Sequence, residues 1–282
     1  MLLLKGKPVA DKIKADIIHA VEEYKKVGNA PKIAILRVGA REEDLAYEER
    51  VLKNCRAVGI ATKVLEVDLN ISTESFIEEL NRLNEDTSIH GILIFRPLPA
   101  HLDEGKIGRT IKPEKDIDCM SPVNTEKVFT GDRSGIAPCT PEAVIEVLKF
   151  YDYNLQSKNV SIVNRSMVLG KPLAMLFLAE NSTVTICHSK TKDLKDATKR
   201  SDIVVTGVGR GEFFGPDYFT EDSVVIDVGI NFAEGKLCGD VDFDKVSEQV
   251  SAISPVPGGV GTVTSMILLS HVIKAMKLQR AK

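Results

Sequence analysis

The chain has 282 residues, of which 43% are hydrophobic and 27% charged, the composition of an ordinary globular protein with about two domains. Its 37 basic and 40 acidic side chains leave a formal net charge of -3, which argues against nucleic acid or an anionic membrane surface as a partner. The five cysteines and five histidines lack the spacing of a disulfide framework or a metal site, and the first apolar run is too short for a signal peptide. We therefore expect a cytoplasmic protein without a bound metal.

The first half of the chain alternates helical and apolar strand-like segments. We expect helices over residues 8–26, 42–57 and 73–84, and strands over residues 32–38, 60–68 and 90–95. Because strands separated by helices favour parallel pairing, this half predicts a parallel sheet with helices on both faces. A segment rich in Pro and Gly, residues 97–141, then interrupts the pattern before a helix at 142–150, and we place the domain boundary there.

The second half repeats the alternation with shorter strands. These strands are expected at residues 160–163, 183–187, 203–206 and 224–228, with helices at 170–178 and 192–199. Four short apolar strands within about 70 residues are typical of a Rossmann-like unit. A last helix, residues 262–277, is expected to return to the first domain.

These elements predict an α/β protein with two domains around a cleft. One domain comprises residues 1–140 together with the C-terminal segment 262–282, and the other, residues 141–261, is a Rossmann-like nucleotide-binding domain. The absence of a long flexible linker indicates that the two domains are held close together, which is where a ligand cleft is expected.

A dinucleotide site is predicted where the strands of the second half end. The strand at 160–163 continues into residues 164–166 and then into a helix with Pro172 in its first turn, and the free N–H groups of such a helix start attract phosphate. The loop lacks the Gly-x-Gly-x-x-Gly pattern, so a plain structural turn remains an alternative. The next strand ends in residues 187–191, which offer hydroxyl, imidazole and ammonium groups but no carboxylate, and this favours NADP over NAD.

Residues near other strand ends are candidates for ligand binding, and each also has a plain structural interpretation. Glycines within 206–210 and 227–231 suit either the close approach of a nicotinamide or plain turns. In the first half, Tyr47 lies in an acidic helical stretch, which is also typical of a solvated face. The segment 95–101 follows a strand directly, at the end where ligands bind in parallel sheets. Asp118 suits either hydrogen bonds from an aminopyrimidine ring or a solvated loop.

Ten segments, among them RVGAREEDLAYEERVLKNCRAVGI, HGILIFRPLPAH, PEKDIDCMSPVN, VNRSMVLGKPLA and SPVPGGVGTVT, follow one another along nearly the whole chain. In this order they resemble the methylenetetrahydrofolate dehydrogenase/methenyltetrahydrofolate cyclohydrolase (FolD-type) family. The resemblance implies a folate-binding catalytic domain, an NADP-binding domain and a homodimer joined through the latter. The family oxidises 5,10-methylenetetrahydrofolate to the methenyl cation and usually hydrolyses that cation to 10-formyltetrahydrofolate. This chemistry serves one-carbon metabolism, including the synthesis of purines, methionine and histidine.

The resemblance also implies roles for individual residues. Tyr47 would stack on the aminobenzoyl part of the folate, Asp118 would hold the pterin, and both are our candidate catalytic residues. Substrate contacts are further implied for Pro257, Gly258 and Gly259. Contacts to NADP are implied for Asn164, Arg165, Ser166, Ser189 and Ile230.

The chain departs from the family where the chemistry should take place. The family has a Lys one helical turn after the Tyr, which serves the hydrolysis, and Val51 stands there; Phe95 replaces a Gln. Hydride transfer needs mainly the positioning of substrate and cofactor, whereas hydrolysis needs tuned proton transfer. We therefore expect a dehydrogenase whose cyclohydrolase activity is weak or lost.

Further replacements leave alternatives open. Asp44, Arg96, Asn164 and Thr262 stand where the family has Ser, Leu, Gly and Pro, and the opposite charges of Asp44 and Arg96 leave open whether the two form a new contact. One alternative is a fully bifunctional enzyme in which Arg50 or another group substitutes for the Lys. Others are a non-catalytic NADP-binding relative and an NADP enzyme that acts on a different substrate.

Overall fold

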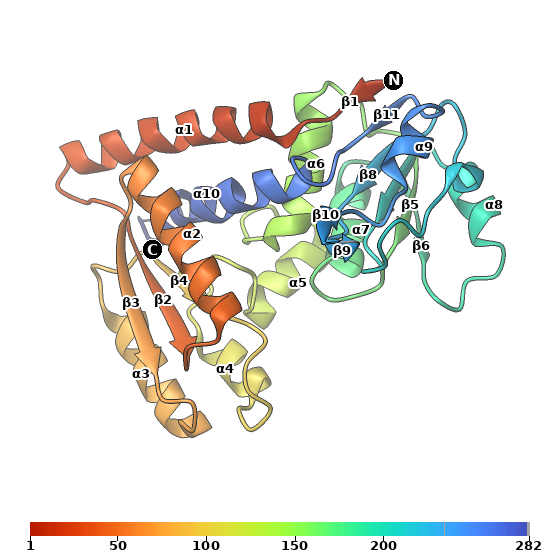
Figure 1. Cartoon of the computed structure of the whole chain (residues 1–282). Helices are drawn as coiled ribbons and strands as arrows, with labels where there is room; N and C mark the ends of the chain where they lie inside the picture. Colours follow the sequence, from red (N-terminus) through yellow and green to blue (C-terminus); the bar gives the residue numbers. More distant parts are fainter. Residues whose placement is uncertain (234, 281–282) are drawn as a thin grey trace. The chain divides into compact units, whose positions relative to one another are not determined.

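The computed structural model describes residues 1–233 and 235–280, which divide into two compact units (Figure 1). Unit 1 comprises Met1–Asp11 and Pro138–Thr264, and unit 2 comprises Lys12–Ala137 and Ser265–Lys282. The first eleven residues thus group with the second half of the chain, unlike the boundaries expected from the sequence. The reason is the short strand β1 (Leu2–Leu3), which pairs with β11 (Ala252–Ile253) of unit 1.

Unit 2 is built on a parallel sheet with β2 (Lys32–Val38) between β3 (Ala61–Val67) and β4 (Gly91–Ile94). The central strand is apolar on both faces because helices cover both, and six of its seven residues are buried. Leu36 is in register with Leu65 and with Ile94. The carboxyl ends of the three strands therefore meet at one edge, and the loops that follow them lie together there.

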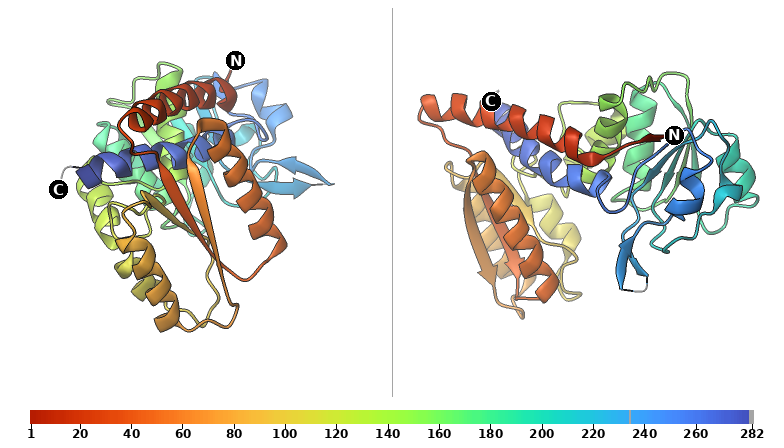
Figure 2. Two further views of the ribbon diagram at one scale, coloured as in Figure 1. Left: turned by 90° about the vertical axis from the view of Figure 1, so that its left-hand side faces the viewer. Right: turned by 45° about the horizontal axis from the view of Figure 1, so that its top comes forward.

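Helices cover the two faces of this sheet. The helices that belong wholly or mainly to unit 2 are α1 (Gly6–Lys26), α2 (Glu42–Val58), α3 (Thr73–Glu85), α4 (Glu104–Thr110), α5 (Pro122–Thr130) and α10 (Val260–Arg280). Figures 1 and 2 show α2 and α3 on opposite sides of the strands. Phe76 and Leu80 of α3 pack with Leu36 and Ile94 of the sheet and with Ile107 of α4. This apolar layer holds the strand ends in place.

The C-terminal helix α10 belongs to unit 2 from Ser265 onward. Nδ1 of His271 donates to the carbonyl of Ile117, and Gln279 donates to the carbonyls of His90 and Glu114. Its last turns are thereby attached to the loop 111–121. That loop carries Asp118, so the helix helps to fix a candidate site residue.

A buried lysine closes the end of α3. The ammonium of Lys115 donates to the carbonyls of Leu83, Asn84 and Asp86, which have no partner inside the helix. Cations are favoured at helix C-termini, where the carbonyl ends of the peptide dipoles point. Burial lowers the pKa of Lys115, the nearby Lys112 lowers it further, and Asp86 opposes the shift.

Unit 1 contains a second parallel sheet, of order β1-β11-β8-β7-β5-β6. Its longer strands are β5 (Asn159–Val163), β6 (Thr183–Cys187), β7 (Ile203–Thr206) and β8 (Val224–Asp227). The chain passes from β5 to β6 on one side and then to β7 on the other. The switch point of the sheet therefore lies between β5 and β7, where open α/β sheets bind ligands.

The remaining elements of unit 1 cover this sheet and extend from it. They are α6 (Cys139–Phe150), α7 (Gly170–Ala179), α8 (Leu194–Lys199), the 3-10 turn Pro216–Tyr218, α9 (Phe243–Ser247), and a hairpin of β9 (Asn231–Ala233) and β10 (Lys236–Cys238). Phe214, Phe219 and Val246 pack against Val204 and Val225 on one face. Two α/β units with parallel sheets confirm the predicted fold class.

A membrane-spanning helix is not found in the described part of the chain: none of its helices is both long and apolar enough.

Candidate functional site

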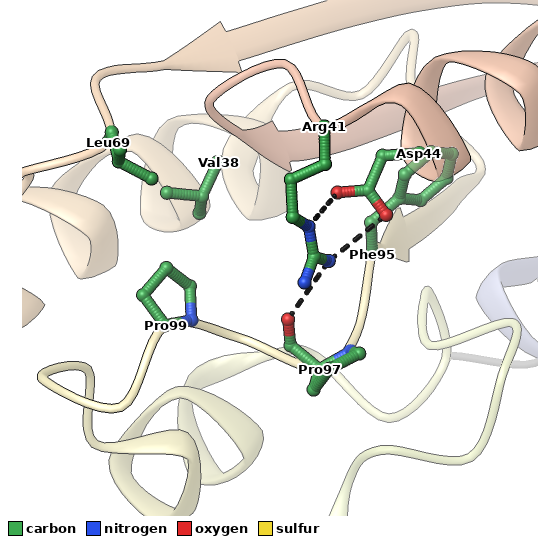
Figure 3. Close-up of a pocket in the computed structure, with 7 residues that line it drawn as sticks. All are labelled: Val38, Arg41, Asp44, Leu69, Phe95, Pro97 and Pro99. Carbon is green, nitrogen blue, oxygen red and sulfur yellow. Dashed lines mark hydrogen bonds and ion pairs between the residues drawn. The ribbon is translucent and has the colours of Figure 1, made fainter.

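A pocket lies at the carboxyl edge of the sheet in unit 2 (Figure 3). Its lining comes from the ends of all three strands and from the start of α2: Val38, Arg41, Asp44, Leu69, Phe95, Pro97 and Pro99. Val38 is the last residue of β2, and Phe95 follows β4 directly. Ligands bind in parallel sheets at this edge, and the pocket is accordingly our candidate substrate region.

Tyr47 lies beside this pocket, against Phe95. Their ring centroids are 5.0 Å apart at an interplanar angle of 43°, and the guanidinium carbon of Arg50 lies 5.5 Å from the centre of the Tyr47 ring. Val51, one helical turn after Tyr47, is 4% exposed. The surroundings of Tyr47 therefore include an aromatic ring and an exposed arginine, with a buried aliphatic side chain at the position where the family has an ammonium group.

A buried arginine fixes the helix that carries Tyr47. Arg37, 3% exposed, donates to Glu48 on α2 at 2.9 Å and to Glu66 on β3 at 2.8 Å, and also to the carbonyl of Gly39. Burial opposes the charge of Arg37, but the hydrogen bonds from its guanidinium to Glu48 and Glu66 outweigh it and raise its pKa. Arg37 was not among the residues predicted from the sequence, although a charge that follows four apolar residues inside a strand is a signal for such a pair.

Asp44 and Arg96 do not contact each other, because each has another partner. The Asp44 carboxylate accepts two hydrogen bonds from Arg41, at 2.7 and 3.0 Å, and the same guanidinium reaches the carbonyl of Pro97 (Figure 3). The question left open by their opposite charges is thereby answered, because the two do not pair. The arginine that pairs with Asp44 lies three residues before it, at the start of α2.

Arg96 pairs instead with Asp118. Its Nη2 lies 2.9 Å from Oδ2 of Asp118, and its Nη1 lies 3.9 Å from Oε1 of Glu104 in the first turn of α4. Burial alone would lower the pKa of Arg96, but the charges of Asp118 and Glu104 raise it. Asp118 is thus the carboxylate of this loop that faces the end of β4.

The neighbouring Asp116 has a structural role. It is 1% exposed and accepts hydrogen bonds from the N–H groups of Met120 and Ser121 and from the side-chain amide of Asn124. Burial raises its pKa, whereas these hydrogen bonds lower it. Of the two carboxylates in this loop, Asp116 therefore holds the turn together, and this turn positions Asp118.

In unit 1, the predicted cofactor residues lie on adjacent strand ends. Val163 is in register with Cys187 and with Thr206, so the residues after β5, β6 and β7 share one edge. Within residues 1–233 and 235–280, the side chains of Arg165, Ser189 and Lys190 make no hydrogen bond or ion pair, and all three are exposed. Two cations and a hydroxyl without a protein partner form a donor set that fits a phosphate-bearing dinucleotide.

Asn164 ties these strand ends together. Its side-chain oxygen accepts from the N–H and hydroxyl of Ser166 and from the N–H of Gly170, while its amide nitrogen donates to the carbonyl of Gly207 after β7. Gly170 permits this arrangement because a Cβ there would lie 2.0 Å from the carbonyl oxygen of Asn164. Both side-chain atoms of Asn164 are therefore engaged within the protein.

The backbone N–H groups at the start of α7 differ from what was expected for the cofactor site. The N–H groups at the start of α7 were expected to be free for phosphate, but that of Gly170 is bonded to Asn164 and that of Lys171 to the carbonyl of Ser166. Pro172 has no N–H. The donors that remain for phosphate are the side chains around this helix start, not its backbone.

The loop after β7 is held by an internal carboxylate. Asp240, fully buried, accepts from the N–H groups of Val208, Gly209 and Arg210 and from the side-chain amide of Asn231. The sequence analysis missed Asp240, and neither its spacing nor its surroundings in the sequence give a signal for it.

A second buried carboxylate, Asp227, lies at the end of β8. It accepts from the hydroxyl of Thr206 and from the N–H groups of Gly229 and Val241. Burial raises its pKa to about 6, although the hydrogen bonds from Val241 and Gly229 oppose the shift. Ile230, a predicted cofactor contact, follows this strand and is 67% exposed.

The predicted substrate residues Pro257, Gly258 and Gly259 lie in unit 1, before α10. The carbonyl of Gly258 accepts from the N–H of Gly6 at the start of α1, and the φ of Gly258 is 98°, in the range that favours glycine. Gly259 is buried against the carbonyl of Pro255. Tyr47 and Asp118 belong to unit 2, whereas residues 257–259 belong to unit 1.

Comparison with known families assigns both parts of the chain. The model of the tetrahydrofolate dehydrogenase/cyclohydrolase NAD(P)-binding domain matches residues 138–280, and that of the catalytic domain of the same family matches residues 4–118. The chain belongs to the tetrahydrofolate dehydrogenase/cyclohydrolase family. This confirms the predicted family, the dehydrogenase function and a nicotinamide dinucleotide as the cofactor.

Individual relatives in this family are similar over nearly their whole length. The bifunctional protein FolD of Clostridium botulinum (strain Okra / Type B1) is 52% identical over 274 residues, 97% of either chain, and that of Alkaliphilus oremlandii is 54% identical over 278 residues, 98% of either. Among solved structures, FolD of Campylobacter jejuni is 37% identical with a TM-score of 0.96 over 99% of both chains. The Trypanosoma brucei enzyme, solved with NADP and an inhibitor, is 33% identical with a TM-score of 0.90, over 100% of this chain and 98% of that one.

Proposed function

We propose that the protein oxidises 5,10-methylenetetrahydrofolate to 5,10-methenyltetrahydrofolate with NADP, and that its cyclohydrolase step is weak or absent. The observation that carries the second part is that the position one helical turn after Tyr47 holds the buried aliphatic side chain of Val51, and that Phe95 packs against the tyrosine ring. Hydrolysis of the methenyl cation requires a water molecule and a group that accepts its proton. Neither valine nor phenylalanine can take a proton at any pH.

We assign the aromatic contact and the pterin contact of the substrate to residues of unit 2. Tyr47 offers a ring face to the aminobenzoyl group, and the Asp118 carboxylate accepts hydrogen bonds from the pterin ring. Pro257, Gly258 and Gly259 border the substrate. The position of Asp118 at the same edge of the sheet as the pocket supports this assignment.

The cofactor is assigned to Asn164, Arg165, Ser166, Ser189 and Ile230. When bound, NADP accepts the hydride of the methylene carbon. Arg165 and Lys190 supply positive charge for a 2′-phosphate, and Ser189 supplies a hydroxyl; their lack of partners among the described residues supports NADP over NAD. The Trypanosoma brucei relative, whose structure contains NADP, supports the same choice.

A fully bifunctional enzyme is the second candidate, because relatives 52% identical to this chain are named bifunctional. It requires a substitute for the family Lys. Arg50 lies close to Tyr47, but a guanidinium keeps its proton at neutral pH and is a poor proton shuttle. We therefore favour the dehydrogenase with reduced hydrolysis.

The experiment follows NADPH and the methenyl chromophore separately after methylenetetrahydrofolate and NADP are mixed with enzyme, with correction for spontaneous hydrolysis. NADPH formation with accumulating methenyltetrahydrofolate is the expected result. Enzyme-accelerated loss of the methenyl chromophore would establish the bifunctional candidate. If the folded protein forms no NADPH, the proposed oxidation itself is wrong.

Assembly and location form a further part of the proposal. We infer a cytoplasmic homodimer joined through unit 1, which supplies one-carbon units for the synthesis of purines, methionine and histidine. The exposed apolar side chains of Phe232 and Leu237 on the hairpin of unit 1, 78% and 36% exposed, support association of this unit. Light scattering of the wild type and of Phe232→Ser tests it, and a monomeric wild type at micromolar concentration would contradict it.

A further inference from the structure

We propose that Arg96 competes with the substrate for Asp118, and that Glu104 is the alternative partner that receives Arg96 when substrate binds. Arg96 is then a positioning residue that sets the affinity for folate through Asp118. This inference rests on the proposed function, in which Asp118 holds the pterin ring.

The geometry places one guanidinium between two carboxylates. Nη2 of Arg96 bonds to Oδ2 of Asp118 at 2.9 Å, while Nη1 lies 3.9 Å from Oε1 of Glu104, at the outer limit of an ion pair. The Arg96 and Asp118 side chains are 26% and 32% exposed, and that of Glu104 is 50% exposed. A rotation of the arginine side chain toward Glu104 would keep its charge paired while it leaves Asp118.

The chemistry of the substrate makes the ring and Arg96 compete for one carboxylate. An aminopyrimidine ring presents a ring N–H and an amino group side by side, and this pair matches the two oxygens of one carboxylate, as the fork of a guanidinium does. Arg96 already donates to Oδ2 of Asp118, so a ring that binds through both oxygens has to share Oδ2 with the guanidinium. The contact through both oxygens is therefore favoured when Arg96 turns away from Asp118.

Glu104 is well placed to accept the displaced charge. It lies in the first turn of α4 and makes no other ion pair or side-chain hydrogen bond within the described ranges 1–233 and 235–280. Without Glu104, the displaced guanidinium would lose its carboxylate partner, which makes displacement less favourable. The two residues are thus expected to act on folate affinity in opposite directions.

The test compares Arg96→Leu, Arg96→Lys, Glu104→Gln and the double variant Arg96→Leu/Glu104→Gln. Steady-state rates give KM and kcat, and calorimetry with tetrahydrofolate gives Kd without turnover. Arg96→Leu should lower KM and Kd for folate about fivefold to tenfold, because it removes a charge-assisted hydrogen bond that competes with the substrate for Asp118. The kcat should stay within about twofold, and KM for NADP should not change. Arg96→Lys, which keeps the competing charge, should stay close to the wild type.

The Glu104 variants decide the second half of the proposal. Glu104→Gln should raise KM and Kd for folate about threefold in the wild-type background and have no effect once Arg96 is Leu. Glu74→Gln is the matched control, because Glu74 is an exposed glutamate in the first turn of α3. It should change neither constant.

The opposite outcomes overturn the proposal. A higher KM in Arg96→Leu with an unchanged Glu104→Gln variant would mean that Arg96 binds the substrate itself. Equal effects of Glu104→Gln with and without Arg96 would mean that Glu104 acts independently. If the wild type forms no NADPH but binds tetrahydrofolate, the proposed oxidation fails while calorimetry still tests Arg96; if it does not bind tetrahydrofolate, both proposals fail.

Discussion

The side-chain amide of Asn164 donates a hydrogen bond to the carbonyl of Gly207 and so joins the ends of β5 and β7. These two strands flank the switch point of the sheet in unit 1, where the cofactor is expected. The oxygen of the same side chain holds Ser166 and the first residue of α7. One residue thereby sets the loop on both sides of the switch point.

Replacement of Asn164 should loosen this loop. We expect Asn164→Ala to lower the free energy of unfolding by about 2 to 3 kcal/mol, because it leaves the N–H groups of Ser166 and Gly170 without their acceptor. The KM for NADP should rise about tenfold, a loss of about 1.4 kcal/mol. Urea unfolding and steady-state rates measure both quantities. The control is Asn154→Ala, which removes only a local turn contact to Gln156; equal effects of the two variants would refute the role of Asn164.

The hydrolysis prediction is tested at Val51. Val51→Lys should raise the enzymatic hydrolysis of methenyltetrahydrofolate at least about a hundredfold, the lower end of what general acid–base catalysis contributes, because it restores an ammonium one turn after Tyr47. The variant should lose about 1 to 3 kcal/mol of stability, since the site is buried. Val51→Met, of similar length but without charge, should not gain hydrolysis. A folded Val51→Lys enzyme with unchanged hydrolysis would show that a Lys at position 51 is not sufficient, and Val51→Lys/Phe95→Gln would then be measured.

Asp227 makes stability depend on pH. Its pKa is raised to about 6 in the folded protein, against about 3.9 in an unfolded chain. Well below pH 4 both states are protonated and the group has no effect. Between about pH 4 and pH 6 the unfolded chain ionises at this residue while the buried carboxyl stays protonated, so the free energy of unfolding falls, by about 3 kcal/mol in total once the pH is above 6 and both states are ionised.

Comparison with Asp227→Asn isolates this effect. Denaturant unfolding at pH 4, 5, 6 and 7 should show the wild type losing stability relative to Asp227→Asn as the pH rises, whatever constant offset the amide introduces. Asp222→Asn, at an exposed position, should run parallel to the wild type. Parallel curves for the wild type and Asp227→Asn would contradict the raised pKa.

Lys115 should contribute to stability and not to catalysis. Lys115→Met removes the ammonium that serves three carbonyls at the end of α3, and we expect a loss of about 2 to 4 kcal/mol. Lys112→Met, which removes an exposed ion pair with Glu85, should cost less than about 1 kcal/mol. Thermal and urea unfolding of both variants provide the comparison, and a Lys115 variant as stable as the Lys112 variant would exclude the capping role.

Much of the fold was predictable because the spacing of apolar residues along a segment indicates whether it forms a helix or a strand. The strands β2, β6 and β7 lie at the residues predicted for them. The strands β1 and β11 were not predicted, because two residues are too few to show any alternation. Their pairing joins residues some 250 positions apart, and no local pattern encodes such a contact.

The candidate site was predictable in its composition and less so in its pairing. The resemblance put Tyr47 and Phe95 among the residues around the substrate, and the structure shows their rings in contact. It left open whether Asp44 and Arg96 pair, and in the structure Asp44 is bound by Arg41, three residues before it, and Arg96 by Asp118. Which of several nearby opposite charges pair depends on loop geometry, which sequence spacing does not specify.

The buried carboxylate of Asp240 occupies the place of an anion in the turn 207–210. The N–H groups of the three successive residues 208–210 form a concave site of the type that binds phosphate in other proteins. Here the protein supplies the negative charge from its own chain, so the turn has its final shape before any ligand arrives. Cofactor binding then incurs no entropy cost for ordering this turn, and the phosphates of the cofactor must be recognised elsewhere on the same edge.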